Sequence, residues 1–380
     1  MDILNEYLNS TGLFHLTLGN ILFFVIGFLF LFVAIVKKLE PYVLLPLGIG
    51  IIIANLPYSG LGEFNLTGTI QGSGIFGIIF HYALSYWNLL PPLIFLGLGA
   101  MTDFGPIIAN PKTLFLGVAA QIGIFLAFWA AKASGVFTIE EAVAVGIIGG
   151  ADGPTTIFTS AKLAPHLLGI TSVVAYSYMA GVVFIQPPLM KLLTTKKERQ
   201  IIMKPLREVS KIEKLLFPVL SMIIIILLVP ESAPLISMFM IGNLIKESGV
   251  VPRLANSISN ELLNIATIFL MITVGVQLSA DKVMNAQSLM ILGLGLGAFA
   301  CGTIGGLLLA KLMNLFLKEK INPLIGSAGV SAVPMAARLS HMIAQKENPN
   351  NYLLPHAMGP NVAGVIGSAV VAGVFITVLS

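Results

Sequence analysis

The chain has 380 residues, of which 56% are hydrophobic and only 10% are charged. Its mean hydropathy is +0.94, and a soluble domain carries about 25% charged residues. The composition therefore excludes an ordinary soluble protein and predicts an all-α, polytopic membrane protein. A net charge of +4 suggests nucleic-acid binding only in a soluble protein. Most basic residues here flank apolar stretches, where they set membrane topology, so we expect no nucleic-acid partner.

Ten apolar stretches predict about ten transmembrane helices. They lie at about 13–36, 42–56, 89–101, 113–134, 168–193, 213–229, 233–247, 262–280, 287–316 and 355–379. The second, third and seventh are shorter than a usual span, so we expect them to tilt or to lie partly in the interface. Two further apolar segments, 140–165 and 321–345, are interrupted by Gly, Pro and polar residues. We expect these two segments to be broken or re-entrant.

A stretch rich in basic residues, 194–214, links the fifth predicted helix to the sixth. It contains seven lysines and arginines against three glutamates, which predicts a cytoplasmic loop because positive charge favours that side. If each broken segment enters and leaves on one side, the other basic loops also lie inside, with Lys282 as the main exception. Both termini and the long 57–88 loop are then external.

The two halves of the chain show a weak but ordered correspondence. The matched blocks are 95–110 with 269–285, 147–151 with 324–328, and 178–182 with 361–365. With five crossings and one broken segment in each half, residues 1–200 and 201–380 run in opposite directions, which predicts an inverted repeat. Such repeats place the binding site near the midplane, where the broken elements face each other. The alternative is a chance match, because Gly, Ala, Ile and Val fill any transmembrane helix.

Asp152 lies in the first broken segment, with apolar residues on both sides. A carboxylate inside the membrane is costly and marks a candidate ion or proton site, and broken helices free carbonyl groups that coordinate Na+ or H+. Thr155 and Thr156 follow within one turn and offer hydroxyl ligands for a hard cation, or else they cap the helix. The alternative for Asp152 is a structural carboxylate that is paired with Arg338 or Lys162.

The second broken segment carries Asn322, Ser327, Ser331 and Arg338 in otherwise apolar surroundings. For Ser327 alone we favour a close-packing role. A guanidinium at this depth needs a partner. The choices are Asp152 or an anionic substrate such as a carboxylate, which arginine binds through two hydrogen bonds.

Tyr178 and Asn361 occupy matching positions in the two halves. Tyr178 lies well inside its apolar run, and Tyr176 does not share its face, so we favour an interior role over an interfacial anchor. There the phenol is a candidate for hydrogen bonding to a substrate or for passing a proton. Asn361 precedes a Gly-rich helix, which suits a ligand at a helix start or an N-cap. The histidines lack metal-ligand spacing, and no nucleotide-binding motif is present.

These motifs resemble the β subunit of the biotin-dependent, sodium-pumping decarboxylases. That subunit is the carboxybiotin decarboxylase of the oxaloacetate, methylmalonyl-CoA, glutaconyl-CoA and malonate systems. The likeness covers nearly the whole chain and is carried by residues 99–104, 149–155, 185–188 and 359–364. It implies an enzyme that decarboxylates carboxybiotin and couples this reaction to Na+ export. It also implies an elevator-like core that slides against a scaffold.

The residues and the resemblance together give a candidate site with three groups of members. The predicted catalytic residues are Asp152, Tyr178 and Arg338, and the predicted carboxybiotin contacts are Arg338, Asn322 and Ser331. The predicted Na+ ligands are Asp152, Thr155, Asn322, Gly326, Ser331 and Asn361.

The resemblance further implies partners and a location. A biotin carrier protein or domain supplies carboxybiotin without attaching it to this chain. A carboxyltransferase α subunit, a small γ or δ membrane subunit and a homotrimer of this chain complete the expected complex in a bacterial or archaeal cytoplasmic membrane. The acyl substrate stays open, because its specificity lies on another subunit.

Two other classes of function remain. The first is an elevator-type, Na+-coupled secondary transporter of a carboxylate, with Arg338 gripping the substrate. The second is a purely structural membrane anchor for a soluble enzyme, for which Asp152→Asn is silent. Dependence on a biotinylated partner separates the first from the pump.

Overall fold

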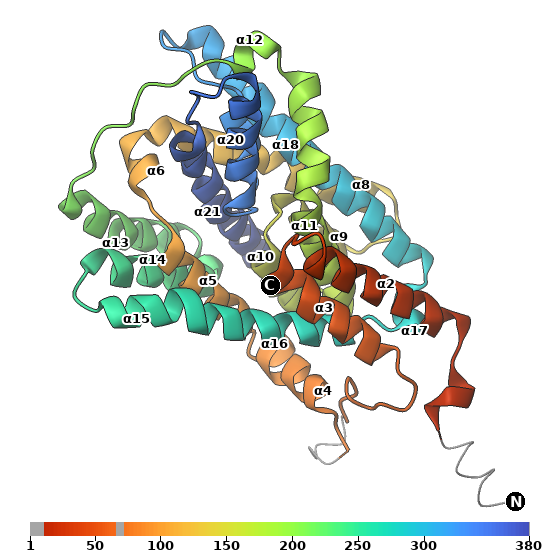
Figure 1. Cartoon of the computed structure of the whole chain (residues 1–380). Helices are drawn as coiled ribbons and strands as arrows, with labels where there is room; N and C mark the ends of the chain where they lie inside the picture. Colours follow the sequence, from red (N-terminus) through yellow and green to blue (C-terminus); the bar gives the residue numbers. More distant parts are fainter. Residues whose placement is uncertain (1–10, 66–71, 380) are drawn as a thin grey trace, which may run out of the picture.

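The computed structural model describes residues 11–65 and 72–379. These residues form helices of many lengths, and no strand occurs among them. The all-α class is thus confirmed, and Figure 1 shows the helices in chain order.

Each of the ten predicted spans corresponds to a helix or a series of helices. They are α2 (Leu18–Ile35), α3 (Pro41–Ala54), α5 (Leu90–Met101), α7 and α8 (Leu114–Ala120, Ile122–Ala133), α11 (Leu168–Leu193), α13 (Lys211–Leu228), α14 (Ala233–Ser248), α15, η7 and α16 (Pro252–Ser257, Ile258–Leu262, Leu263–Val276), α18 (Ala286–Phe316) and α21 (Leu354–Leu379). Among the described residues, five helices are long and apolar enough to cross a membrane, or up to seven if each of two bent pairs is one span. The chain is a multi-pass membrane protein.

The region before α5 differs from its prediction as a loop. Residues 66–71 of the predicted 57–88 loop lie outside the described residues. After them, α4 (Ile75–Ile79) and η2 (Phe80–Tyr86) form a helix that meets α5 at a bend of 74°. The loop prediction was wrong for 75–86, because its glycines suggested a turn. Gly77 instead serves close packing, since a Cβ there would lie 2.0 Å from the Glu63 carbonyl oxygen.

The first broken segment folds as a helical hairpin, called here the first hairpin. It consists of α9 (Ile139–Gly146), η4 (Ile147–Gly150) and α10 (Gly153–Leu163). Its turn places Ala151 in the left-handed region, with φ of 55°. Glu141 Oε1 and His166 Nε2, at the two ends of the segment, lie 2.7 Å apart. Both ends therefore lie on the same side of the molecule.

The second broken segment also folds back on itself and is called here the second hairpin. It comprises α19 (Leu324–Ser327), α20 (Met335–Glu347) and the connection between them. Arg199 of the 194–214 linker holds both of its ends. The Asn322 side chain donates to the Arg199 carbonyl at 2.9 Å, and the Arg199 guanidinium pairs with Glu347 at 2.8 Å.

The two hairpins enter from opposite ends of the molecule. The second hairpin starts and ends beside the basic linker. The helix pair α7 and α8 starts beside the same linker, where Arg207 donates to the Ile108 carbonyl at 3.3 Å, and leads at its far end into the first hairpin. The tips meet in the middle, where the Ser331 N–H donates to the Gly150 carbonyl at 2.9 Å.

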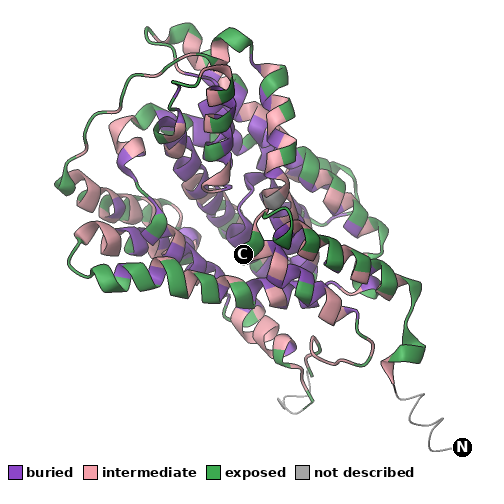
Figure 2. Cartoon of the chain, viewed as in Figure 1, coloured by how far each residue is buried: buried purple, intermediate pink, exposed green. Residues whose placement is uncertain are grey.

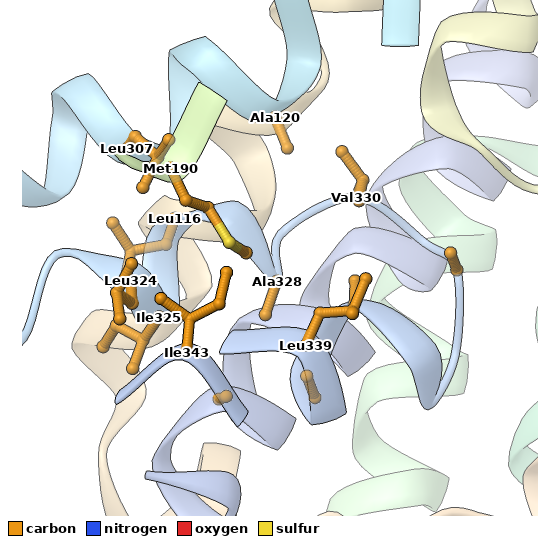
Figure 3. Close-up of a cluster of buried hydrophobic side chains, with 14 of the residues drawn as sticks. Leu116, Ala120, Met190, Leu307, Leu324, Ile325, Ala328, Val330, Leu339 and Ile343 are labelled. Atoms are coloured by element: carbon orange, nitrogen blue, oxygen red, sulfur yellow. The ribbon is translucent and has the colours of Figure 1, made fainter. Parts of the chain in front are cut away.

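Buried residues gather around the two hairpins. Figure 2 shows them in the centre of the molecule, with exposed residues along α2, α8 and α15. One apolar cluster packs the second hairpin against α7, α11 and α18. In Figure 3, Met190 of α11 and Leu307 of α18 lie together against Leu324 and Ile343 of the second hairpin. Many apolar side chains on the outer helices are exposed, as a lipid-facing surface requires.

The role of Arg199 gives a stability prediction. We expect Arg199→Leu to lower the free energy of unfolding by about 3 kcal/mol, because it leaves the largely buried carboxylate of Glu347 without its partner. The matched control is Lys204→Leu, whose ion pair with Glu319 is mostly exposed and contributes about 0.5 kcal/mol. Thermal unfolding of the purified protein measures both. Equal small shifts would contradict the role of Arg199 as the clamp of the second hairpin.

Candidate functional site

Asp152 lies at the tip of the first hairpin and is only 4% exposed. It is the N-cap residue of α10. One carboxylate oxygen accepts the Thr155 backbone N–H at 3.1 Å, and the other accepts the Ser368 hydroxyl at 2.7 Å. Two neutral donors therefore hold this buried carboxylate.

The predicted alternative of a fixed ion pair for Asp152 is wrong. No ion pair among the described residues includes it. Lys162 pairs with Glu231 instead, because α10 runs away from the tip and ten residues of helix span about 15 Å. Arg338 is exposed on α20. Within the part of the chain that the structure describes, no cation therefore pairs with Asp152.

Ser331 reaches Asp152 through a residue that the sequence did not reveal. The Ser331 hydroxyl donates to the Ser368 hydroxyl at 3.4 Å, and Ser368 in turn donates to Asp152. Ser368 follows Asn361 by seven residues in α21, so both lie on one helix face. That spacing was the only signal in the sequence that linked Ser368 to the site.

Two predicted ligands have buried oxygens without a hydrogen-bond partner. The Asn361 amide donates both hydrogens, to the carbonyls of Ala328 at 2.9 Å and Val330 at 2.8 Å, which leaves its oxygen unpartnered. The Thr155 hydroxyl oxygen is also unpartnered, and both side chains are fully buried. Asn361 lies well inside α21 rather than at its start, so the N-cap alternative is wrong.

Thr156 has a local role. Its hydroxyl donates to the Asp152 carbonyl at 2.8 Å, one turn back along α10. Such a bond satisfies a hydroxyl inside an apolar segment. The Thr156 hydroxyl therefore has a partner within α10, whereas the Thr155 hydroxyl has no hydrogen-bond partner among the described residues.

Asn322 and Gly326 lie at the base of the second hairpin. The Asn322 amide donates to the carbonyls of Arg199 and Ile201, and its oxygen accepts the Leu324 N–H. Gly326 packs against Gly306 of α18, and a Cβ on Gly326 would lie 2.1 Å from the Gly306 carbonyl oxygen. We call Asp152, Thr155, Ser331, Asn361 and Ser368 the tip cluster. No hydrogen bond between the described residues connects Asn322 or Gly326 to Asp152, and both lie outside this cluster.

The two tyrosines of α11 have different surroundings. The Tyr178 hydroxyl donates to the carbonyl of Leu292 in α18, and its side chain is half-buried. Tyr176 is 4% exposed, and its ring covers Gly153, where a Cβ would lie 2.2 Å from the ring. The tyrosine beside the tip of the first hairpin is thus Tyr176, although the sequence favoured Tyr178.

Arg338 faces the loop between α2 and α3. Burial raises the pKa of the Glu40 carboxyl above its usual value, and the positive charge of Arg338 opposes this shift. Arg338 forms no ion pair within 4.0 Å among the described residues. Its guanidinium is accessible to an anionic group.

The tip cluster combines one carboxylate with neutral hydroxyl and amide oxygens. Hard cations such as Na+ prefer oxygen ligands of this kind. Among the described residues, no group of three or more His, Cys, Asp or Glu side chains is arranged to hold a metal ion. The donor set therefore fits a weakly held, hard monovalent cation better than a tightly bound transition metal.

Comparison with known proteins supplies the family. The sequence profile described as the Na+-transporting oxaloacetate decarboxylase beta subunit matches residues 19–379. The chain belongs to this family. The methylmalonyl-CoA decarboxylase subunits beta of Propionigenium modestum and Veillonella parvula are each 52% identical to this β subunit, with alignments over at least 98% of both chains. The oxaloacetate decarboxylase beta chain of Klebsiella pneumoniae is 47% identical, with 99% of both chains aligned.

Family membership confirms the resemblance found in the sequence. This β subunit is the membrane component of a sodium-translocating decarboxylase, which is an enzyme of several subunits. Its apolar helices agree with a multi-pass location.

Proposed function

We propose that this β subunit decarboxylates carboxybiotin, which a separate carrier presents, and uses the reaction to export Na+ through the tip cluster. The observation that carries the proposal is the buried carboxylate of Asp152, at the point where the two hairpins meet, which has no cationic partner in residues 11–65 and 72–379. An intramembrane acid of this kind marks an ion pathway.

The chemistry supplies the energy that Na+ export needs. Moving one charge against 100 mV costs about 2.3 kcal/mol. In the proposed step the N–CO2− bond of carboxybiotin breaks, CO2 leaves, and the ureido nitrogen takes up a proton. A site shielded from water favours loss of the carboxylate, because its charge is poorly solvated there.

The proposed roles follow the positions of the residues. Asp152 is the charged Na+ ligand, and Thr155, Ser331 and Asn361 supply neutral oxygens, two of them unpartnered. The exposed guanidinium of Arg338 binds the carboxylate of carboxybiotin through two hydrogen bonds.

Three further residues of the predicted site lie outside the tip cluster and hold the surrounding helices together. Asn322 ties the second hairpin to the linker, and Gly326 allows that hairpin to approach α18. Tyr178 ties α11 to α18. We propose that these three residues set the positions of the hairpins, and that Ser331 contacts both the cation and the carboxybiotin group.

We propose that the halves 1–200 and 201–380 are inverted repeats of an elevator. The support is that the hairpins enter from opposite ends and meet at Ser331 and Gly150. In this arrangement the hairpins, with α7, α8, α18 and α21, form the moving core. Helix α3 packs against both α2 and α16, and these three helices form part of the scaffold.

The proposed partners are a biotin carrier, a carboxyltransferase α subunit, a small γ or δ subunit and two further copies of this chain. Helix α2 has room for such contacts, since only Phe23, Gly27 and Ala34 of its 18 residues are buried. The basic 194–214 linker is proposed to face the cytoplasm, where the carrier arrives.

Reconstituted complex in proteoliposomes tests the proposal. We expect Na+ uptake into inverted vesicles when oxaloacetate or methylmalonyl-CoA is added, and the substrate that works identifies the acyl group. Avidin should abolish this uptake, because it sequesters the biotin of the carrier. Uptake that avidin leaves unchanged, and that follows a carboxylate gradient instead, would favour the secondary transporter.

A further inference from the structure

Gln121 lies in the middle of a membrane span. It is the eleventh residue of the 23-residue span Pro111–Ala133 and is only 3% exposed. A polar side chain at this depth is costly unless it hydrogen-bonds or serves a function. Neither the sequence patterns nor the comparisons single out this residue.

The orientation of the Gln121 amide is defined by its donors. The nitrogen donates to the carbonyls of Gly117 at 3.0 Å and Gly364 at 3.2 Å. A flipped amide would point its oxygen at both carbonyl oxygens, which is unfavourable. The side-chain oxygen therefore points away from them, and it is buried without a hydrogen-bond partner.

This oxygen faces the tip of the first hairpin. A Cβ built on Gly150 would lie 3.1 Å from the Ser368 Cβ and 3.7 Å from the Gln121 Oε1. Ser368 is the residue that donates to Asp152. The Gln121 oxygen, Ser368 and Asp152 thus surround the same turn of the chain.

We propose that the side-chain oxygen of Gln121 is a ligand of the Na+ that Asp152 binds. This inference rests on the proposed function and adds a residue from the α7 and α8 span to the site. Gln121 and Asn361 share one arrangement, in which both amide hydrogens bind backbone carbonyls and the oxygen is left for a cation. Gln121 also donates to the Gly364 carbonyl of α21. The position of its side-chain oxygen therefore depends on the position of that helix.

An unpartnered amide oxygen alone does not define the site, and Asn243 provides the comparison. Its amide donates to the carbonyls of Gly99 and Thr102, and its oxygen is buried without a partner. Asn243 lies on α14 and faces α5, and Glu247, one turn further along α14, is paired with Lys246 at 3.5 Å and Lys214 at 3.9 Å. Asn243 is therefore a matched control for the loss of a buried amide away from Asp152.

The test compares Gln121→Met with Asn243→Leu in the purified complex. The measurement is the Na+ concentration that gives half-maximal decarboxylation, together with the thermal stability without Na+. We expect Gln121→Met to raise this concentration about tenfold, which corresponds to about 1.4 kcal/mol, with the rate recovering as Na+ is raised. Asn243→Leu should lower stability to a similar extent and leave the Na+ dependence unchanged.

A second variant keeps the test decisive if Gln121→Met does not assemble. Gln121→Asn keeps an amide but withdraws its oxygen by one carbon, and we expect a rise of several-fold in half-saturating Na+. An unchanged Na+ dependence in either Gln121 variant overturns the inference. Asp152→Asn distinguishes failure of the Gln121 inference from failure of the proposed function. If Asp152→Asn is inactive while Gln121→Met has normal Na+ dependence, only the ligand role of Gln121 fails. If Asp152→Asn is fully active, the proposed function fails.

Discussion

Replacing Asp152 by asparagine is expected to lower the rate of Na+-dependent decarboxylation at least about a hundredfold, which corresponds to about 2.7 kcal/mol. The substitution keeps the shape of the side chain but removes the only charge found in the tip cluster of described residues. It also places an NH2 group where Asp152 accepts from Thr155 or Ser368, which loses at least one charge-assisted hydrogen bond. The rate is measured with the purified complex over a range of Na+ concentrations.

The control for this variant is Asp281→Asn. Asp281 is an exposed carboxylate in α17 (Ala280–Val283), and we expect its substitution to leave the rate unchanged. If Asp152→Asn is as active as Asp281→Asn, the chain is a structural anchor and the tip cluster does not take part in the reaction.

Replacing Gly326 by alanine is expected to lower the free energy of unfolding by about 3 kcal/mol, at the upper end for overpacking. The new methyl group would lie 2.1 Å from the Gly306 carbonyl oxygen. The atoms it meets belong to the backbone of α18, so no flexible side chain can move aside to make room. The second hairpin would then be displaced from α18. Thermal unfolding of the purified complex measures the loss.

The matched control is Gly297→Ala in α18. A Cβ there meets no atom within 4 Å, so we expect a gain of up to about 1 kcal/mol from helix propensity. The Na+ dependence of the Gly326 variant separates two roles of this glycine. Normal stability with a raised Na+ requirement would contradict the packing role and would favour the ligand role that the family resemblance implies.

The sequence predicted the helices well because a membrane imposes a simple rule. Long apolar stretches form helices, and interruptions by Gly and Pro mark the broken segments. It also singled out Asp152 and Asn361, which the structure buries, since polar groups are rare and conspicuous in apolar surroundings. The lack of an ion-pair partner for Asp152 among the described residues could not be predicted, because it depends on where Arg338 and Lys162 point.

Long-range contacts explain what the sequence did not reveal. The hydrogen bond between Ser368 and Asp152 joins residues that lie 216 positions apart. Helix α11 is apolar on most of its faces, so periodicity separated Tyr176 from Tyr178 without indicating which of them faces the first hairpin. The ligand role of Asn322 came from the family resemblance, and a single sequence could not show that its amide donates to the backbone of the linker.

The 194–214 linker also helps to position the second hairpin. Besides its positive charge, it contacts both ends of the second hairpin through Arg199. A capping box at Thr195 starts the short helix Lys196–Arg199 within the linker, and another at Ser210 starts α13. Binding of the proposed carrier near this linker would therefore bias the second hairpin, as in a two-state element controlled by a ligand.

Stabilisation by Na+ tests most directly whether the tip cluster binds the cation. The measurement is the shift in thermal unfolding of the purified complex when NaCl replaces KCl at constant ionic strength. At a Na+ concentration of 100 times the dissociation constant, binding should stabilise the native protein by about 2.7 kcal/mol. We predict that the Asp152→Asn variant loses this stabilisation and that Asp281→Asn keeps it. Full stabilisation by Na+ in the Asp152→Asn variant would contradict the account.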